Sequence, residues 1–310
     1  MKHRVLAIVG PTACGKTEIS LVLRAFLPIE ILCMDSMQIY RGMDIGTAKP
    51  TKQEQSLVPH HMLDIAEPWE EYSVAAYRQD AMACIDGILR RGNVPVLVGG
   101  TGMYLRALSL PMDYGDTKGD EGIRRKYEEL AASQGNDALH ALLMEKDAVT
   151  ANRLHPNDVR RVVRALEVLE ITGQPLSNQR MPGYEEGPYH ILPFAPDMGR
   201  QLLYERVNLR ARRMMEEGLI EEIAGLLRRG VPENAQSMQG IGYKEVLPYL
   251  KAEQSLEETL LQLQQRTRNY AKRQLTWFRA DKRLRWMRPE SADSMAQQIA
   301  TMYREDTHES

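Results

Sequence analysis

One segment near the N-terminus constrains the fold of this chain more than any other. It reads Gly10-Pro11-Thr12-Ala13-Cys14-Gly15-Lys16-Thr17, which has the G-x-x-x-x-G-K-T spacing of a phosphate-binding loop. An apolar run, residues 5–9, precedes the loop, and a helical pattern, residues 17–26, follows it. In this context backbone N–H groups can surround a phosphate, Lys16 can reach its outer oxygens, and the Thr17 hydroxyl can hold Mg²⁺. The segment therefore predicts a strand, a loop and a helix that bind a phosphorylated ligand.

Residues 1–112 alternate short apolar runs with helical patterns. We expect strands at 5–9, 29–34 and 94–98, and a long amphipathic helix at 72–91. Apolar strands separated by helices indicate a parallel sheet with helices on both faces, so the predicted class is α/β of the P-loop NTPase type. Ligands bind at the carboxyl ends of such strands. The phosphate loop, Asp35–Ser36 and Gly99–Thr101 should therefore meet in one cleft.

The pattern changes after residue 112. From 113 to 190 we expect a helical insertion, with helices at 122–133, 136–146 and 158–172. A returning strand is expected at 191–195, and from there we expect the chain to be helical to its end, with helices at 200–217, 219–229, 243–250 and 256–277. The predicted domains are a core made of residues 1–112 and 191–310, with a helical C-terminal region, and a helical insertion of residues 113–190.

Composition limits the remaining classes of protein. The chain has 310 residues and a net charge of only -2, so affinity for nucleic acid would have to come from local clusters of cations. Cys14, Cys33 and Cys84 form no C-x-x-C pair, which argues against structural zinc or a disulfide framework and favours the reducing cytoplasm. No apolar run reaches the length of a membrane span, and we expect no signal sequence.

The strongest local charge lies near the C-terminus. Residues 266–288 contain nine Lys or Arg residues and one acidic residue, which gives a local charge of +8. Four aromatic residues lie among these cations and offer stacking surfaces to the unpaired bases of an RNA loop: Tyr270, Trp277, Phe278 and Trp286. A solvated helix face whose aromatic residues point into the core is the alternative that this segment leaves open.

Several longer blocks follow one another in a consistent order between residues 4 and 287. The most specific, residues 35–50, reads Asp-Ser-Met-Gln-Ile-Tyr-Arg-Gly-Met-Asp-Ile-Gly-Thr-Ala-Lys-Pro. The others are the phosphate loop and residues 60–64, 99–101, 160–167, 239–244 and 272–279. Together these blocks closely resemble the tRNA dimethylallyltransferase family, also called tRNA isopentenyltransferases, in its bacterial form without a zinc finger.

The resemblance implies transfer of a dimethylallyl group from dimethylallyl diphosphate to N6 of the adenosine 3′-adjacent to the anticodon, in tRNAs that read codons beginning with U. It implies Mg²⁺ as cofactor, the tRNA anticodon stem-loop as partner and a monomeric protein, with the insertion of residues 113–190 as a tRNA-binding domain. Residues 10–17 and Arg210 would bind the donor diphosphate, and Thr101 and Arg124 would meet the target nucleotide or the adjoining RNA. The other RNA-binding residues that it implies are Asp35, Ser36, Met37, Gln38, Arg160, Arg161, Val162, Val163, Arg164, Gln239, Gly240, Ile241, Gly242, Tyr243, Lys244, Lys272, Arg273, Gln274, Leu275, Thr276, Trp277, Phe278 and Arg279.

The chemistry of such a transfer fits the residues. Negative charge grows on the departing diphosphate, and the loop N–H groups, Lys16 and Mg²⁺ held by Thr17 can stabilise it. The adenine N6 must lose a proton as the C–N bond forms, and Asp35, at the end of the second strand, is the candidate general base. A carboxylate that caps the chain locally or orients Mg²⁺ ligands is the alternative for Asp35. The predicted catalytic residues are Lys16, Thr17, Asp35 and Thr101.

Three other functions remain open on the sequence alone. They are a small-molecule kinase with the insertion as its lid, a prenyltransferase that acts on free AMP or ATP, and a non-catalytic RNA-binding protein. The basic aromatic segment argues against the first two, and the complete phosphate loop argues against the third. Gln239 and Lys244 stand where many relatives have arginine, which weakens the expectation of a bidentate phosphate contact there.

Overall fold

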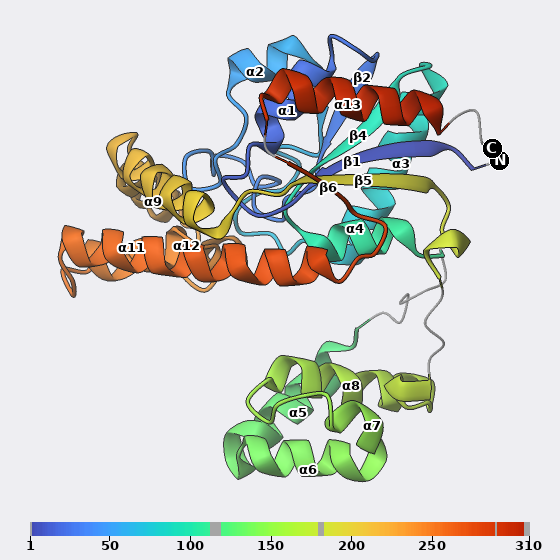
Figure 1. The fold of residues 1–310 in the computed structure, drawn as a ribbon. Coiled ribbons are helices and arrows are strands. Elements are labelled where there is room, and N and C mark those ends of the chain that lie inside the picture. The colour runs from blue at the N-terminus through green and yellow to red at the C-terminus, as the bar shows by residue number, and fades with distance from the viewer. Residues whose placement is uncertain (1, 112–118, 179–182, 289, 307–310) are drawn as a thin grey trace. The chain divides into compact units, whose positions relative to one another are not determined.

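The computed structural model describes residues 2–111, 119–178, 183–288 and 290–306. These residues form two compact units. The larger unit comprises Met1–Ser109 and Gly187–Ser310, and the smaller one is Leu110–Glu186. The larger unit contains a sheet flanked by helices, whereas the smaller unit is helical (Figure 1). The sequence predicts the insertion at 113–190, and the first of these boundaries lies outside the described residues.

The larger unit is built on one parallel sheet. In the described residues it has six strands in the order β3-β2-β4-β1-β5-β6, and every pair of neighbours is parallel. The strands are β1 Arg4–Val9, β2 Ile29–Cys33, β3 His60–His61, β4 Val94–Gly99, β5 His190–Pro196 and β6 Arg285–Met287. Because helices cover both faces, residues 5–9 of β1 are fully buried. The α/β class predicted from the sequence is confirmed.

Two hydrophobic cores lie on opposite faces of the sheet. On one face, α1 (Lys16–Leu23) packs with the C-terminal helix α13 (Ala292–Glu305), and their cluster includes Leu6 and Ile8 of β1. On the other face lie α3 (Val74–Arg90) and α4 (Gly102–Ser109), whose Tyr77 and Tyr104 rings stack with centroids 3.6 Å apart. Alternate residues of β1 enter the two clusters, as the two-residue period of a strand requires.

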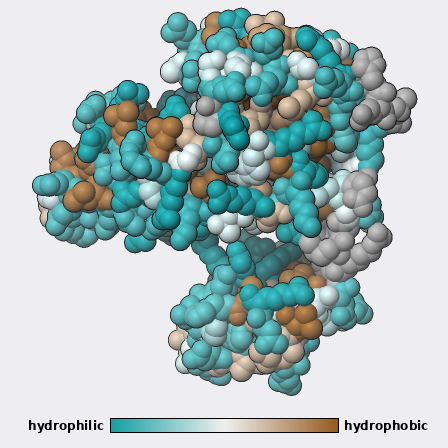
Figure 2. All heavy atoms as spheres, in the orientation of Figure 1, coloured by the Kyte–Doolittle hydropathy of each residue, from teal (hydrophilic) through white to brown (hydrophobic). Residues whose placement is uncertain are grey.

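A third core joins the C-terminal helices to the loop that follows β2. Its helices are α9 Arg200–Glu216, α10 Leu219–Arg228, α11 Tyr243–Leu250 and α12 Leu256–Arg279, with the short 3₁₀ helix η3 Ser237–Gln239. From the loop come Ile39, Tyr40 and Met43, all fully buried. The remaining helix of this unit, α2, is Lys52–Leu57. Figure 2 shows apolar patches on the surface where α9 and α11 lie, beside mainly hydrophilic side chains.

The smaller unit has its own core. It contains α5 Glu121–Gln134, α6 Asn136–Lys146, α7 Ala148–Ala151, α8 Val159–Thr172 and the 3₁₀ helices η1 Leu176–Asn178 and η2 Tyr184–Glu186. Leu139 and Leu143 of α6 pack against Val162 and Leu166 of α8, and all four are fully buried. Each pair is spaced four residues apart, so its members share one face of their helix.

The expected helices and strands are found, with ends displaced by about one helical turn or less. The prediction that the chain is helical to its end after β5 is wrong, because Arg285–Met287 forms β6 and pairs in parallel with β5. Three residues show too little alternation for a strand to be identified from the pattern. Among the described helices, none combines the length and the apolar character needed to cross a membrane.

Candidate active site

The phosphate loop connects β1 to α1 through backbone that includes positive φ angles. Gly10 and Gly15 have φ angles of 133° and 91°, which glycine adopts at little cost. The Lys16 ammonium donates to the carbonyl oxygens of Gly10 and Pro11, with N···O distances of 3.1 and 2.7 Å. The N-cap residue of α1 is Gly15, which has no side chain to cap the first turn, so the N–H groups of this turn can bind an anion. The loop thus has the donors and the charge that a phosphate needs.

Thr12 of this loop is held by two helices of the C-terminal region. Arg210 of α9 donates from Nη1 to the Thr12 hydroxyl at 3.2 Å, and the Thr12 N–H donates to Oε1 of Gln274 of α12 at 2.9 Å. Burial lowers the pKa of Arg210. A guanidinium nevertheless keeps its charge in proteins, so Arg210 adds a second cation beside Lys16.

Asp35 follows β2 and lines the same cleft as Lys16. Its Oδ1 accepts a hydrogen bond from the Met37 N–H at 2.9 Å. Desolvation raises the pKa of Asp35, while the Met37 N–H, Lys16 and Arg210 act in the opposite direction. A carboxylate with a raised pKa takes up a proton more readily, which suits a general base. The hydrogen bond from the Met37 N–H also stabilises the chain just after β2. The geometry is therefore compatible with Asp35 as a general base and with Asp35 as a structural carboxylate.

The carboxyl ends of the central strands meet in one cleft, as the sequence predicts. The cleft has a volume of about 1230 Å³, and the phosphate loop, Asp35–Gln38 and Gly99–Gly100 line it. Thr101 joins two of these strand ends, because its Oγ1 accepts a hydrogen bond from the Ser36 N–H at 3.1 Å. The cationic residues that line the cleft are Lys16, Lys49, Lys52, Arg206, Arg210, Arg213, Lys244 and Arg273. The acidic residues that line it are fewer: Glu18, Asp35, Asp44, Glu54 and Glu217. The resulting excess of positive charge favours anionic ligands.

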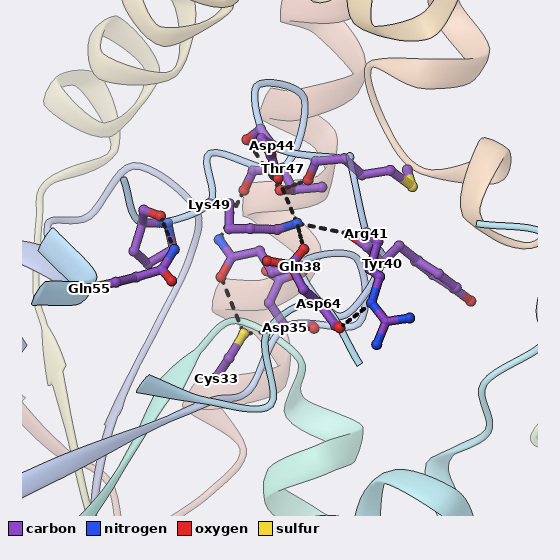
Figure 3. A network of polar contacts seen from close by, with 12 residues as sticks. Cys33, Asp35, Gln38, Tyr40, Arg41, Asp44, Thr47, Lys49, Gln55 and Asp64 are labelled. Atoms are coloured by element: carbon purple, nitrogen blue, oxygen red, sulfur yellow. Dashed lines mark hydrogen bonds and ion pairs between the residues drawn. The ribbon is translucent and has the colours of Figure 1, made fainter. Parts of the chain in front are cut away.

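A buried lysine organises the long loop after β2 (Figure 3). Lys49 donates to the Tyr40 carbonyl oxygen at 2.8 Å and forms ion pairs with Asp44 and Asp64, at 2.7 and 2.6 Å. Only 3% of its side chain is exposed. Because a buried ammonium needs partners for its charge and its three protons, these contacts fix the fold of the loop.

Two further side chains hold the same loop against the cleft. The Gln38 amide donates to the carbonyl oxygens of Thr47 and Ala48 at 3.0 and 3.1 Å (Figure 3). The Glu222 carboxylate of α10 accepts from three successive N–H groups, those of residues 44, 45 and 46, at 2.8, 2.8 and 3.1 Å. The distinctive 35–50 block is therefore a folded wall of the cleft. Its support from α10 is not visible in the sequence.

Comparison with known proteins identifies the family. Residues 38–281 match the sequence model described as IPP transferase. The chain belongs to the IPP transferase family. A protein named tRNA dimethylallyltransferase from Pelotomaculum thermopropionicum is 46% identical over 96% of this chain and 96% of its own. Another of the same name, from Oceanobacillus iheyensis, is 43% identical over 94% of this chain and 92% of its own.

Solved structures agree with this membership. The full-length tRNA isopentenylpyrophosphate transferase from Bacillus halodurans superposes with a TM-score of 0.74 at 42% identity, and the alignment covers 99% of this chain and 98% of that one. A eukaryotic dimethylallyltransferase acting on tRNA gives a TM-score of 0.75 at 32% identity, over 89% of this chain and 70% of that one. The P-loop NTPase-like fold predicted from the sequence is thus the fold of the IPP transferases.

The implied RNA-binding segments of this IPP transferase mix exposed and buried side chains. Around α11, Gln239 and Lys244 are exposed, whereas Tyr243 is fully buried and its hydroxyl donates to Glu222 at 2.7 Å. On α12, Gln274 and Phe278 are buried, and the exposed residues are Lys272, Arg273, Thr276, Trp277 and Arg279. Packing and internal hydrogen bonds occupy the side chains of Tyr243, Gln274 and Phe278, which argues against RNA contact by these three side chains. RNA binding by these segments stays a prediction.

The remaining residues of these segments are partly exposed, apart from two buried glycines. Partly exposed are Ser36, Met37, Gln38, Ile241 and Leu275, while Gly240 and Gly242 are buried. Of the four aromatic residues expected to stack on bases, only Trp277 is exposed; Phe278 is in the core, and Tyr270 and Trp286 are half-buried. The core alternative, which the sequence left open, therefore applies to Phe278.

The smaller unit of this IPP transferase contains the remaining implied residues. Arg160 and Arg161 of α8 are exposed, but Val162 and Val163 are buried in the core of the unit, which argues against RNA contact by these two side chains. Arg124 and Arg164 both pair with the fully buried Glu167 carboxylate, at 2.8 and 2.6 Å, and lie close to each other. An anion at this surface would meet two oriented guanidinium groups.

Sequence reasoning missed the supporting role of several residues, including Gln274, which it assigned to RNA binding. Gln274 illustrates the reason, since its partners Thr12 and Gly100 lie 262 and 174 positions away in the chain. Lys49 and Glu222 act in the same way, through contacts that only the folded chain creates. A local motif reveals residues that touch a ligand through a fixed spacing. It carries no signal for residues that hold such a motif from another element.

Proposed function

We propose that this chain transfers the dimethylallyl group of dimethylallyl diphosphate to N6 of the adenosine 3′-adjacent to the anticodon, in tRNAs that read codons beginning with U. The single observation that carries the proposal is the common cleft of the phosphate loop and Asp35 in a chain of the IPP transferase family. One side of that cleft suits the departing diphosphate, and the other offers a base. We expect the protein to act as a monomer in the cytoplasm.

The donor diphosphate is assigned to the phosphate loop. During transfer the bond between C1 of the dimethylallyl group and the diphosphate oxygen breaks, and the electron pair leaves with the diphosphate. Lys16 and Arg210, which contacts Thr12 of the loop at 3.2 Å, stabilise this charge together with the loop N–H groups. The terminal phosphates of a kinase substrate would also fit there, but no phosphoryl group has to move in this reaction.

Thr17 follows Lys16 at the start of α1, and both line the cleft. Its hydroxyl, next to the site assigned to the diphosphate, fits the usual protein ligand of Mg²⁺ in a phosphate loop. When bound, Mg²⁺ would supply additional positive charge to the leaving group. Lys16 and Arg210 supply charge from the protein itself.

Asp35 is assigned to the acceptor. The N6 lone pair forms the new bond to C1, and the N6 proton passes to the Asp35 carboxylate. The adenine has to leave its stack to reach the cleft, which costs only a few kcal/mol in a loop that is already single-stranded. We assign the same nucleotide to Thr101 as well, because its Oγ1 accepts a hydrogen bond from the Ser36 N–H at 3.1 Å and so lies next to Asp35 in the folded chain.

A substitution in the acceptor distinguishes this function from its alternatives. The protein is incubated with Mg²⁺, labelled dimethylallyl diphosphate and an unmodified anticodon stem-loop, and in parallel with AMP or ATP. The matched control is the same stem-loop with purine, which lacks the N6 amine, in place of the target adenine. We expect label in the adenine stem-loop alone. Label in AMP or ATP instead, or phosphate transfer from γ-labelled ATP to a small molecule, would replace the proposal.

A further inference from the structure

One buried amide on α12 joins two loops of the active site. Gln274 is only 6% exposed. Its Oε1 accepts from the Thr12 N–H at 2.9 Å, and its Nε2 donates to the Gly100 carbonyl oxygen at 2.9 Å. Thr12 belongs to the phosphate loop after β1, and Gly100 to the turn after β4. A single side chain therefore ties together the ends of two neighbouring strands.

The chemistry of this link fits a carboxamide. It needs one acceptor and one donor on separate atoms at the end of the same side chain, and the carboxamide of Gln274 provides both in one planar group without charge. A carboxylate would accept from Thr12 but would face the Gly100 carbonyl oxygen without a proton. The approach to Gly100 is also close, since a Cβ there would lie 2.1 Å from Nε2 of Gln274. Both bonds compensate the cost of burying the amide.

The opposite face of the same helical turn carries the cations implied to bind RNA. Lys272 and Arg273 immediately precede Gln274 and are exposed, whereas Ala271 and Phe278 share its buried face. The second loop reached by Gln274 continues into Thr101, which contacts the Ser36 N–H beside Asp35. One turn of α12 thus connects an exposed basic surface to the loops assigned to the donor and to the acceptor.

We propose that Gln274 is a positioning residue that holds the phosphate loop in its anion-binding shape and couples this shape to RNA bound on the exposed face of α12. The coupling rests on the proposed function, while the effect on the phosphate loop does not. By thermodynamic linkage, RNA and diphosphate should each raise the affinity for the other by the same factor. Removal of the amide should reduce this factor toward one.

Diphosphate binding tests the effect on the loop. Inorganic diphosphate is titrated in the presence of Mg²⁺ into the full-length protein and into Gln274→Glu and Gln274→Met. Gln264→Glu is the matched control, because Gln264 is also buried on α12 but donates to the Asn208 carbonyl oxygen, at 3.3 Å. We expect about tenfold weaker binding in both Gln274 variants and less than about a twofold change in the control. Equal affinities in all four proteins would overturn the proposal.

The second measurement addresses the coupling. The titration is repeated with a saturating anticodon stem-loop. In the wild type, we expect the RNA to raise diphosphate affinity at least about fivefold, and in Gln274→Glu we expect a ratio close to one while the RNA still binds. The same ratio in both proteins would refute the coupling. If the wild type does not bind the RNA, the proposed function and the coupling both fail, and the diphosphate titration still decides the role in the loop.

The wild-type protein gives a test that needs no variant. The Thr12 N–H should exchange slowly with solvent in the absence of ligand, because its hydrogen bond to a buried amide has to break first. The N–H of Gly92, in the turn after α3 and also bonded to a carbonyl oxygen, is an exposed reference on the same unit. Exchange of Thr12 as fast as that of Gly92 would overturn the proposal, even if the Gln274 variants fail to fold.

Discussion

Strand β2 has a carboxylate near each of its ends, and the two side chains have opposite surroundings. Near the amino end, Glu30 accepts two hydrogen bonds from Arg91, at 2.8 and 2.7 Å, and others from Asn93 and His61. These partners, Arg91 above all, lower the pKa of Glu30 to about 2. Just beyond the carboxyl end, desolvation raises the pKa of Asp35. One carboxylate is stabilised as an anion, and the other is prepared to take up a proton.

The difference shows that the two ends of a parallel sheet have different roles: carboxylates at the amino ends can stabilise the fold, and carboxylates at the carboxyl ends can react with a ligand. The carboxyl ends of its strands form the cleft, where a fully partnered carboxylate would have no capacity left for a substrate. At the amino ends the same type of side chain can be saturated with hydrogen bonds, because nothing has to bind there. Functional groups with perturbed pKa values tend to cost stability, which other parts of the fold supply.

Replacement of Asp35 should give the largest effect and tests the catalytic side of the contrast. Asp35→Asn keeps the size and most hydrogen bonds but removes the basicity, so we expect single-turnover prenylation to slow about 10²-fold to 10⁴-fold. Donor and tRNA affinities should persist. Glu30→Gln, at the other end of the strand, is the matched control and should leave the rate unchanged. If Asp35→Asn instead lost donor affinity with fast chemistry on bound substrates, Asp35 would be a Mg²⁺-orienting or structural carboxylate.

The second largest effect should come from Lys16. Lys16→Ala removes an ammonium from the site of the departing diphosphate, so we expect turnover to fall about 10²-fold or more, equivalent to about 3 kcal/mol of transition-state stabilisation. The affinity for tRNA should be largely retained, because the exposed cations of α12 remain. Near-normal prenylation by this variant would show that the phosphate loop does not bind the leaving diphosphate.

Glu30 tests the stabilising side of the contrast. Glu30→Gln leaves Arg91 without its anion, so we expect a loss of about 1–3 kcal/mol in the free energy of unfolding at pH 7, measured by urea denaturation. The folded-state pKa of Glu30 is lowered from 4.5 to about 2, so its stabilisation is present above about pH 4.5 and is lost as the pH falls toward 2. Glu253→Gln, at an exposed position, should change stability by less than about 0.5 kcal/mol.

Asp35 should show the opposite pH dependence of stability. Because its folded-state pKa is raised above 3.8, the folded protein binds this proton more tightly than the unfolded chain does. The resulting stabilisation is present below pH 3.8 and is lost as the pH rises through the raised value. We therefore expect Asp35→Asn to unfold at a higher temperature than the wild type at pH 7, with the gain shrinking in acid. If Asp35→Asn instead had a lower melting temperature than the wild type at pH 7, the claim that Asp35 and Glu30 have opposite effects on stability would be wrong.

The fold was largely predictable because its signals are local. Apolar runs separated by helical patterns identify β1, β2 and β4, and the phosphate loop fixes what connects β1 to α1. Spacings of three and four residues in the same way identify the helices of the insertion. The strand β6 has only three residues and gains its identity from β5, so no local pattern could reveal it.

The site was predictable only where residues act through a motif. The phosphate loop, Asp35 and Arg210 do meet in one cleft. The RNA-binding segments include buried side chains, among them Val162, Val163 and Phe278, because a helix has exposed and buried faces within one motif. Burial argues against RNA contact by these side chains. The supporting contacts of Gln274 and Glu222 depend on elements brought together by folding, which one sequence without its structure does not show.

The smallest effects should come from replacing single cations near the end of α12. These replacements compare exposed cations, which can bind RNA, with a cation that already has a partner in the protein. Lys272, Arg273 and Arg279 are exposed. Each replacement by Ala should weaken tRNA binding and reduce the slope of log K against log salt by about 0.7 to 0.9, because one phosphate contact is lost. Arg283 is the control, since it pairs with Asp281 at 2.6 Å and contacts Ser109. Arg283→Ala should lower stability and leave the slope unchanged.

Two outcomes would contradict this prediction. Unchanged slopes for all three exposed residues would assign them to a solvated helix face. A reduced slope for Arg283→Ala would show that ion pairing does not distinguish structural cations from RNA-binding cations.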